Sequence, residues 1–125
     1  MTDPVLIVDD EPQLRSLLSK VLCRQGFQTV VAGDGDSALW TAKQLTGKLA
    51  VLVTDIDMPG SMNGVELAKA VRSEFSSIPV VFISALPFSC TVLQEVAPGS
   101  LFVQKPFDSR TLIWAIQTVT CTPPS

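Results

Sequence analysis

Two hydrophobic patterns alternate along the 125-residue chain. Short runs of consecutive apolar residues are separated by longer stretches in which apolar residues recur every three or four positions. Uninterrupted runs are typical of β-strands covered on both faces, whereas the longer spacing is typical of helices with one buried face. The sequence therefore predicts five strands, at residues 4–8, 27–32, 49–54, 78–84 and 101–104.

A helix is predicted after each of these strands. The first helix has the clearest boundaries, because Pro12 suits a first helical turn and Gly26 suits the position just past a helix end. The second helix is expected to end at Gly47 and the third to open after Asn63. Asp108 is expected to start the last helix, which follows the fifth strand.

The fourth helix is predicted to be short or irregular. Pro87 and Pro98 flank this stretch, and proline interrupts helices because it lacks a backbone N–H and its ring clashes with the preceding turn. Only residues 91–96 between the two prolines have convincing helical character.

The alternation of strands and helices places the chain in the α/β class. Short right-handed connections predict a doubly wound parallel sheet of five strands, with helices on both faces. A chain of this length makes one domain around one core. We expect that domain to span residues 1–120, and we expect residues 121–125, with Pro123 and Pro124, to form a frayed end.

Composition and charge exclude several functions. The net charge is −3 with only nine Lys and Arg residues, whereas nucleic-acid binding depends on clustered basic residues. No apolar run approaches the ~20 residues that a membrane helix needs. The chain lacks histidine, which excludes Ser-His and Cys-His nucleophile pairs. Its three cysteines imply neither a zinc site nor a disulfide scaffold, and we expect a cytoplasmic protein. Together with the charge and the short apolar runs, this predicts a protein that binds neither nucleic acid nor membrane.

Polar residues of complementary charge follow four of the predicted strands. Because the carboxyl ends of parallel strands meet at one edge of a sheet, these side chains are expected to converge there. The residues are Asp9 and Asp10 after the first strand, Asp55 after the third, Ser84 at the end of the fourth and Lys105 after the fifth.

Each of these residues has an ordinary explanation by itself, such as acidic side chains at a helix N-terminus or a lysine before a turn. Together, however, their charges balance if Mg²⁺ is present, since three carboxylates oppose one divalent ion and one ammonium group. Mg²⁺ prefers oxygen ligands and usually takes one or two carboxylates. The set predicts a phosphate-handling site in which a phosphoryl group on Asp55 is held by the metal, Lys105 and Ser84.

With these residues in place, the chain resembles the receiver domain of bacterial two-component response regulators over essentially its whole length. The resemblance implies a flavodoxin-like strand order, 2-1-3-4-5. It also implies a phosphoacceptor rather than an enzyme, one that assists its own phosphorylation and dephosphorylation. The donor would be a phosphohistidine on a sensor histidine kinase or phosphotransfer protein. The matching residues are Asp9-Asp10-Glu11, Asp55 with Met58-Pro59-Gly60, Ser84-Ala85 and Lys105-Pro106-Phe107.

The same resemblance implies the metal ligands. Asp10 and Asp55 would bind Mg²⁺ directly, and Asp9 would help through a water molecule. The backbone carbonyl of Asp57 would supply a further ligand. Asp55 would also be the residue that becomes phosphorylated.

Further roles follow from the resemblance for residues around the phosphoryl group. Lys105 would contact the phosphoryl oxygens, and its peptide bond to Pro106 is expected to be cis. Ser84 would move toward the phosphate and vacate space, so that Phe102 rotates inward as the switch residue. Asp57 and Leu86 occupy the positions that tune the lifetime of the phosphoryl group.

Two spacings depart from the common family pattern. One additional residue lies between Asp55 and Gly64, and one fewer lies between Ser84 and Lys105. Both changes leave the acceptor site intact. The loop after Asp55 and the fourth helix are the elements in which we expect departures from the typical family structure.

The output surface is expected to involve the fourth helix, the fifth strand and the fifth helix, through which a downstream protein or a second copy in a homodimer would bind. Phe102 lies on this surface, although an ordinary core role is the alternative. Ile113 and Trp114 flank the apolar stripe of the last helix. Core packing is the favoured interpretation for both, and exposure would mark them as contact residues.

Three other interpretations remain open. Asp55-Ile56-Asp57 resembles the motif of haloacid-dehalogenase phosphatases, in which one carboxylate attacks phosphate and the next but one acts as an acid. That motif normally ends an early strand, whereas here it ends the third. A degenerate receiver acting as a constitutive adaptor is the second alternative. The third is a receiver module from a hybrid histidine kinase or multidomain regulator, although a free-standing regulator is favoured.

Overall fold

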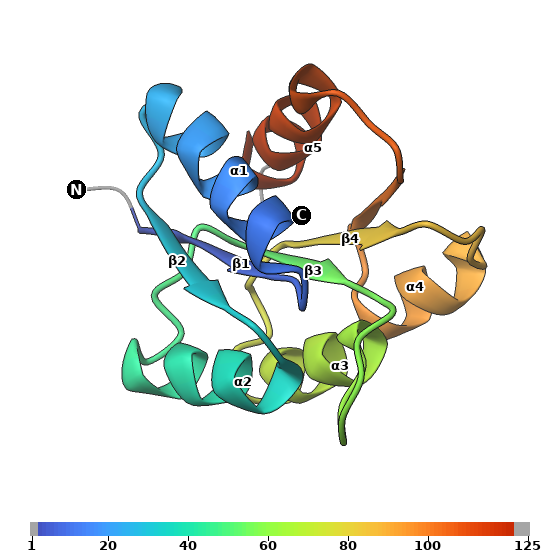
Figure 1. Ribbon diagram of the computed structural model, residues 1–125. Helices are drawn as coiled ribbons and strands as arrows, with labels where there is room; N and C mark the ends of the chain where they lie inside the picture. The colour runs from blue at the N-terminus through green and yellow to red at the C-terminus, as the bar shows by residue number, and fades with distance from the viewer. Residues whose placement is uncertain (1–2, 122–125) are drawn as a thin grey trace.

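The computed structural model describes residues 3–121, and it contains five strands and five helices in strict alternation (Figure 1). The alternation confirms the predicted α/β class. In chain order the elements are β1 (Val5–Val8), α1 (Pro12–Arg24), β2 (Thr29–Ala32), α2 (Gly35–Gln44), β3 (Val51–Asp55), α3 (Gly64–Glu74), β4 (Val80–Ser84), α4 (Cys90–Val96), β5 (Leu101–Gln104) and α5 (Ser109–Cys121).

The strands form one parallel sheet in the order β2-β1-β3-β4-β5, as predicted. The pairing register brings the strand ends together. Val8 of β1 pairs with Thr54 of β3, and Ser84 of β4 pairs with Gln104 of β5. The residues that follow these positions therefore emerge at the same edge of the sheet.

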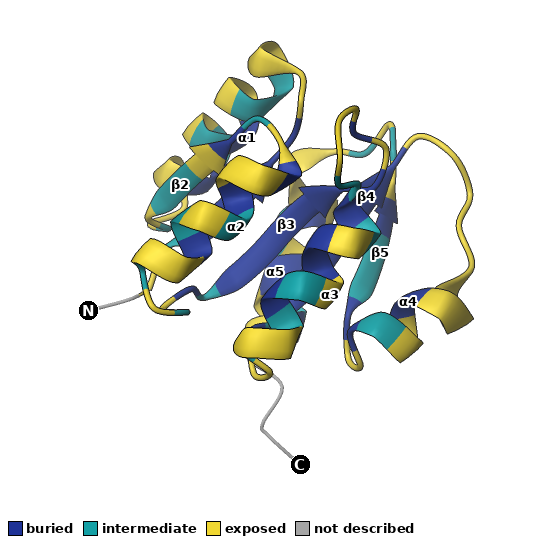
Figure 2. Cartoon of the chain, turned by 90° about the horizontal axis from the view of Figure 1, so that it is seen from below, coloured by how far each residue is buried: buried dark blue, intermediate teal, exposed yellow. Residues whose placement is uncertain are grey.

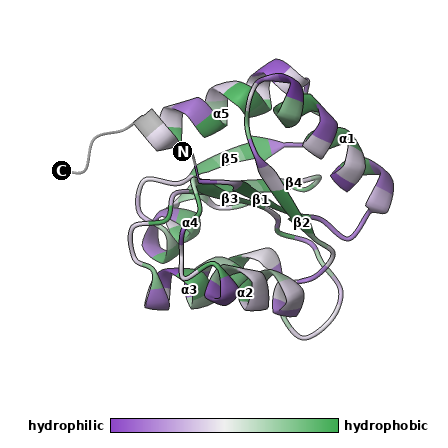
Figure 3. Ribbon diagram, turned by 90° about the vertical axis from the view of Figure 1, so that its left-hand side faces the viewer, coloured by the Kyte–Doolittle hydropathy of each residue, from purple (hydrophilic) through white to green (hydrophobic). Residues whose placement is uncertain are grey.

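The sheet separates two hydrophobic cores, because successive side chains of a strand point to opposite faces. In β1, Val5 and Ile7 pack toward α1 and α5, whereas Leu6 and Val8 pack toward α2, α3 and α4. Figure 1 shows the two helical layers on either side of the sheet, and Figure 2 shows buried strands between helices with exposed outer faces. The hydrophobic strands lie between the two helical layers in Figure 3 as well.

Side-chain caps explain where several helices begin. Asn63 and Glu66 form a capping box at α3, in which each side chain accepts a hydrogen bond from the other residue's backbone N–H. The side chain of Asp108 accepts from the Thr111 N–H at the start of α5. The sequence predicted that the third helix opens after Asn63 and that Asp108 starts the last helix, so both starts are confirmed.

Four of the five strands begin one or two residues later than predicted, and β5 begins at Leu101 as predicted. At β2 the cause is the end of α1, where the Phe27 N–H donates to the Leu22 carbonyl and is unavailable to the sheet. β3 ends one residue later, so Asp55 is the last residue of the strand. α5 runs to Cys121, and the remaining residues of the predicted tail, 122–125, lie outside the described residues.

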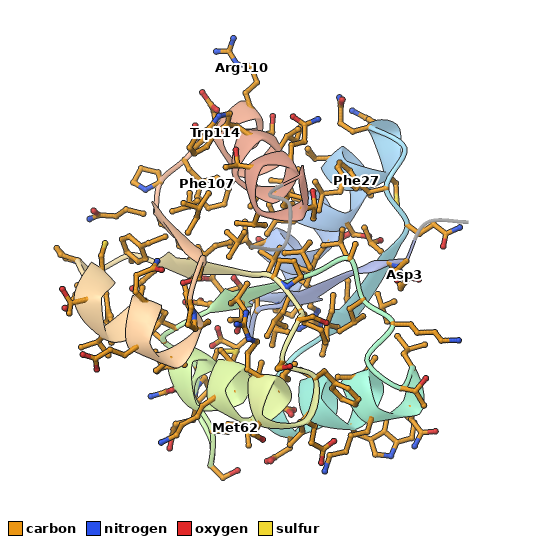
Figure 4. The ribbon with its side chains drawn as sticks, turned by 180° about the vertical axis from the view of Figure 1, so that it is seen from behind. Asp3, Phe27, Met62, Phe107, Arg110 and Trp114 are labelled. Atoms are coloured by element: carbon orange, nitrogen blue, oxygen red, sulfur yellow. The ribbon has the colours of Figure 1, made fainter. Side chains whose placement is uncertain are left out.

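The fourth and fifth helices differ in how well their burial was predicted. α4 has seven residues, and only Leu93 among them is buried, which confirms the prediction of a short helix. Ile113 packs against the core beneath α5. Trp114, however, is 59% exposed, so the prediction of core packing was wrong for this residue. The apolar stripe of α5 already fills that core with Leu112, Ala115, Ile116 and Val119, and Trp114 lies on the outer part of the helix (Figure 4).

Candidate functional site at the carboxyl edge of the sheet

The structure brings the predicted acidic residues together at the carboxyl edge of β1 and β3. Asp9 and Asp55 are buried, and Asp10 is exposed. One carboxylate oxygen from each of the three lies within 4.8 Å of the others. Such a cluster of like charges is costly without cations, because each buried carboxylate loses its hydration.

Lys105 supplies one cation to this cluster from the end of β5. Its Nζ atom lies 2.9 Å from Asp55 Oδ2, 3.4 Å from Asp9 Oδ2 and 3.8 Å from Glu11 Oε1. The Lys105 side chain is 17% exposed, and those of Asp9 and Asp55 are 2% and 4% exposed. The ion pairs with Asp9 and Asp55 are therefore largely shielded from solvent, whereas the Glu11 side chain is exposed. The peptide bond from Lys105 to Pro106 is cis, as the resemblance implied.

Burial and charge shift two pKa values in the site. Burial raises the pKa of Asp55 above its ordinary value of 3.8, although the hydrogen bond and charge of Lys105 oppose that change. Burial by itself would lower the pKa of Lys105, but the hydrogen bond to Asp55 and the charges of Asp9 and Asp55 outweigh it and raise that pKa above 10.5. The site thus holds more negative charge than Lys105 neutralises.

The donor chemistry of the acidic cluster fits a magnesium ion. Asp9, Asp10 and Asp55 present hard oxygen atoms, and three carboxylates facing one ammonium group leave a charge that a divalent cation would compensate. Of these residues, Asp10 and Asp55 are the candidate direct ligands. The bound ion would neutralise charge on a phosphoryl group at this edge of the sheet.

Asp57 makes two contacts in the site that sequence reasoning missed. Its backbone N–H donates to Asp55 Oδ1 at 3.1 Å, and its Oδ2 atom accepts a hydrogen bond of 2.6 Å from the Ser84 hydroxyl. Ser84 Oγ also accepts from the Leu86 N–H at 3.1 Å. No sequence signal predicts the side-chain contact, because it depends on the path of the loop after β3.

Arg15 is a second residue that sequence reasoning missed. Its Nη1 atom donates to the backbone carbonyl of Asp9 at 2.8 Å, and the Glu11 N–H donates to Asp9 Oδ1 at 2.8 Å. These bonds fix the turn between β1 and α1 and orient the Asp9 carboxylate. The position of Arg15 in the first turns of α1, next to an acidic pair, is the one available sequence signal.

The longer loop after β3 is attached to the start of α2. Ser61 donates a 2.7 Å hydrogen bond to Asp36, and Met62 packs so closely on Gly35 that a β-carbon there would lie 2.9 Å from the Met62 side chain. At its far end, Gly64 lies against the backbone carbonyl of Asp55, and its N–H donates to the Ile56 carbonyl. The additional residue therefore lies in a loop that is fixed at both ends.

Phe102 and Leu86, the two remaining predicted residues, differ in their burial. Phe102 is half-buried and packs against the core formed with α2, α3 and α4. Leu86 is 64% exposed. Phe88 and Val92, in the same loop and in α4, are also exposed. The structure thus places apolar side chains at the surface directly after Ser84.

The fold and the site define an α/β protein of flavodoxin-like topology with an acidic cluster and a lysine at the carboxyl edge. Residues 5–117 match the family model of the response regulator receiver domain. The chain belongs to this family, whose members receive signals in two-component systems.

Two relatives differ in how much of their length the chain matches. It is 35% identical over 114 residues to the DNA-binding response regulator MtrA of Mycolicibacterium smegmatis, which covers 90% of this chain and 48% of that protein. It is 30% identical over 118 residues to the chemotaxis protein CheY1 of Helicobacter pylori, covering 92% of this chain and 94% of that one. The chain thus spans about half the length of MtrA and nearly all of CheY1.

Solved structures share the fold. The chemotaxis protein CheY4 of Vibrio cholerae superposes with a TM-score of 0.84 at 29% identity, covering 95% of this chain and 99% of that chain. The response regulator TrrA of Thermotoga maritima, solved in complex with Mg²⁺ and BeF, gives a TM-score of 0.81 at 27% identity over 94% and 99% of the two chains.

None of the helices within residues 3–121 is both long enough and apolar enough to cross a membrane.

Proposed function

We propose that Asp55 accepts a phosphoryl group from a phosphohistidine on a sensor histidine kinase or phosphotransfer protein, in a Mg²⁺-dependent reaction. An oxygen of the Asp55 carboxylate forms a bond to phosphorus while the phosphorus–nitrogen bond of the donor breaks, and the electron pair stays with the imidazole. The observation that carries the proposal is the buried Asp55 carboxylate between the Lys105 ammonium group and the Asp57 N–H. Positioned charges of this kind are what phosphoryl transfer requires.

Two residues would act on the transferred group. The Lys105 ammonium group lies 2.9 Å from Asp55 Oδ2. It would contact the phosphoryl oxygens after transfer, because they carry the negative charge. Ser84 ends the strand next to β3 and would donate its hydroxyl hydrogen to another phosphoryl oxygen. Asp10, Asp55 and the Asp57 carbonyl would hold the Mg²⁺ ion, with Asp9 acting through water.

The output of the domain would be phosphorylation-dependent contact with another protein. Phe102 connects the core to the surface of α4, β5 and α5, and Trp114 adds exposed aromatic area on α5. A homodimer through the same surface is one form that such contact could take. Cys23 and Cys90 are exposed and unpaired, which agrees with a cytoplasmic location.

Incubation with acetyl phosphate and Mg²⁺ tests the proposal. We expect intact mass spectrometry to show one added phosphoryl group, and borohydride reduction followed by peptide mapping to place it at Asp55. Chelation of Mg²⁺ with EDTA should prevent the labelling. An unlabelled protein, or a label on another residue, would refute the assignment.

A phosphatase of the haloacid-dehalogenase type is less well supported. In such an enzyme the second carboxylate acts as an acid toward the leaving group, whereas here the Asp57 carboxylate accepts the Ser84 hydrogen bond. Steady multiple turnover of a phosphomonoester would favour the phosphatase, and a single phosphorylation event would not.

Magnesium affinity should depend strongly on Asp10. Replacing Asp10 with asparagine removes one charged oxygen ligand, so we expect Mg²⁺ to bind at least about tenfold more weakly by isothermal titration calorimetry. Glu95→Gln removes an exposed carboxylate on α4 and provides the matched control, with unchanged affinity. Equal affinities of the two variants would contradict the assignment of Asp10 as a ligand.

A further inference from the structure

The hydrogen of the Ser84 hydroxyl is already engaged in this structure. It has one hydrogen to donate, and that hydrogen goes to the Asp57 carboxylate over 2.6 Å. Its oxygen accepts the Leu86 N–H. A short hydrogen bond to a carboxylate is among the stronger hydrogen bonds in proteins. Ser84 is buried at the end of β4, and Asp57 lies in the loop that follows β3, the strand paired with β4 (Figure 1).

We infer that the Asp57 side chain is a positioning group that holds Ser84 in the resting arrangement and so opposes the switch. The inference rests on the proposed function, in which Ser84 donates to the phosphoryl group on Asp55. Because the hydroxyl has a single hydrogen, it can serve Asp57 or the phosphoryl group, but not both at once. Switching therefore requires the hydrogen bond between Ser84 and Asp57 to break.

Leu86 connects the movement of Ser84 to the protein surface. When Ser84 leaves its resting position, the Leu86 N–H loses its acceptor. That N–H then needs a new acceptor, so the backbone between β4 and α4 is released from the hydrogen bond that fixes it to Ser84. Leu86 and Phe88 project their exposed side chains from this segment. The latch formed by Asp57 and Ser84 thus governs the conformation of an apolar part of the surface.

A charge effect must be separated from the latch. The Asp57 carboxylate stands near the phosphoryl position, so its removal also reduces repulsion toward any anion bound there. That electrostatic effect does not need the Ser84 hydroxyl, whereas the latch does. A double-mutant cycle between the two residues isolates the part that passes through Ser84.

Beryllofluoride with saturating Mg²⁺ is a suitable probe, and its affinity can be measured by titration for wild type, Asp57→Ala, Ser84→Ala and the double variant. We expect Asp57→Ala to show a coupling of about tenfold with Ser84, which means that most of its gain in affinity disappears in the Ser84→Ala background. Ser84→Thr keeps the hydroxyl and should retain the coupling. Glu11→Gln removes a nearby carboxylate that does not touch Ser84, and its effect should be the same in both backgrounds.

The Leu86 amide resonance gives a second measurement, one that a general loss of stability does not imitate. In the free Asp57→Ala protein, this resonance should move part of the way toward its beryllofluoride-bound position. An equal effect of Asp57→Ala with and without the Ser84 hydroxyl would overturn the latch, as would an unmoved Leu86 resonance. Failure of wild type to bind beryllofluoride would overturn both the proposed function and the latch. Normal binding by wild type without the coupling would overturn only the latch, so the two failures are distinguishable.

Discussion

Asp55→Asn is expected to abolish labelling by acetyl phosphate and to stabilise the unmodified protein. The amide cannot form the acyl phosphate bond, and we expect neither Asp9 nor Asp10 to replace Asp55, because both follow β1 and not β3. Labelling should fall below detection in intact mass spectrometry. The exposed substitution Glu95→Gln is the matched control and should label like wild type. Persistent labelling of Asp55→Asn would contradict the assignment.

The stabilisation follows from the raised pKa of Asp55. A folded state with a raised carboxyl pKa binds the proton more tightly than the unfolded state, so ionisation at neutral pH lowers the free energy of unfolding. We expect Asp55→Asn to raise that free energy by about 1 kcal/mol at pH 7. The advantage over wild type should shrink as the pH falls toward 3.8, the ordinary pKa of the group.

Urea denaturation in EDTA measures this difference, because EDTA removes the stabilisation that bound Mg²⁺ would add to wild type. Glu95→Gln should change the free energy of unfolding by less than about 0.5 kcal/mol. A variant less stable than wild type at pH 7 would show that the ion pair with Lys105 outweighs the burial of Asp55. The pH dependence would then have the opposite sign.

Gly64→Ala is expected to have the largest effect on stability. A β-carbon at Gly64 would overlap the backbone carbonyl of Asp55 and would lie 2.8 Å from the Ile56 Cα. Backbone atoms inside a paired strand cannot move aside as a flexible side chain can, so the start of α3 must shift. We expect a loss of about 3 kcal/mol in the free energy of unfolding, measured by urea denaturation.

Gly33→Ala is the matched control for this prediction. A β-carbon there would lie 2.8 Å from the end of the Arg15 side chain, which can shift at the cost of its hydrogen bond to the Asp9 carbonyl, so the loss should stay below about 1.5 kcal/mol. Gly64→Ala should also slow labelling of Asp55, because the substitution displaces the backbone that carries the acceptor. Equal stability of the two variants would contradict the importance of the contact between α3 and Asp55.

The strands and the convergence of the charged residues could be predicted because both depend on a repeated pattern, whereas the strand order was implied by the resemblance to receiver domains. Hydrophobic runs identify buried strands, and parallel pairing then brings their carboxyl ends together. The register of β1 with β3 is what places Asp9 beside Asp55. Asn63 and Asp108 were found in the same way, since capping depends on local chemistry.

The missed features depend on single conformations rather than on patterns. The contact between Ser84 and Asp57 needs one side-chain rotamer and one loop path, which spacing does not specify. The late start of β2 reflects competition for the Phe27 N–H, which bonds to α1 instead of the sheet. Trp114 was misplaced because four smaller residues already fill the core under α5, and a large aromatic residue has no room there.

The ion pair between Lys105 and Asp9 joins residues that are 96 positions apart in the sequence. β5 reaches the sheet only by pairing with β4, and the acidic cluster forms only when β1 and β3 pair. A chain that is still being synthesised, or one whose last strand has come loose, presents the acceptor carboxylate without its ammonium partner. If Asp55 accepts a phosphoryl group as proposed, phosphorylation would therefore require the completely folded chain, and incomplete or damaged copies would not be phosphorylated.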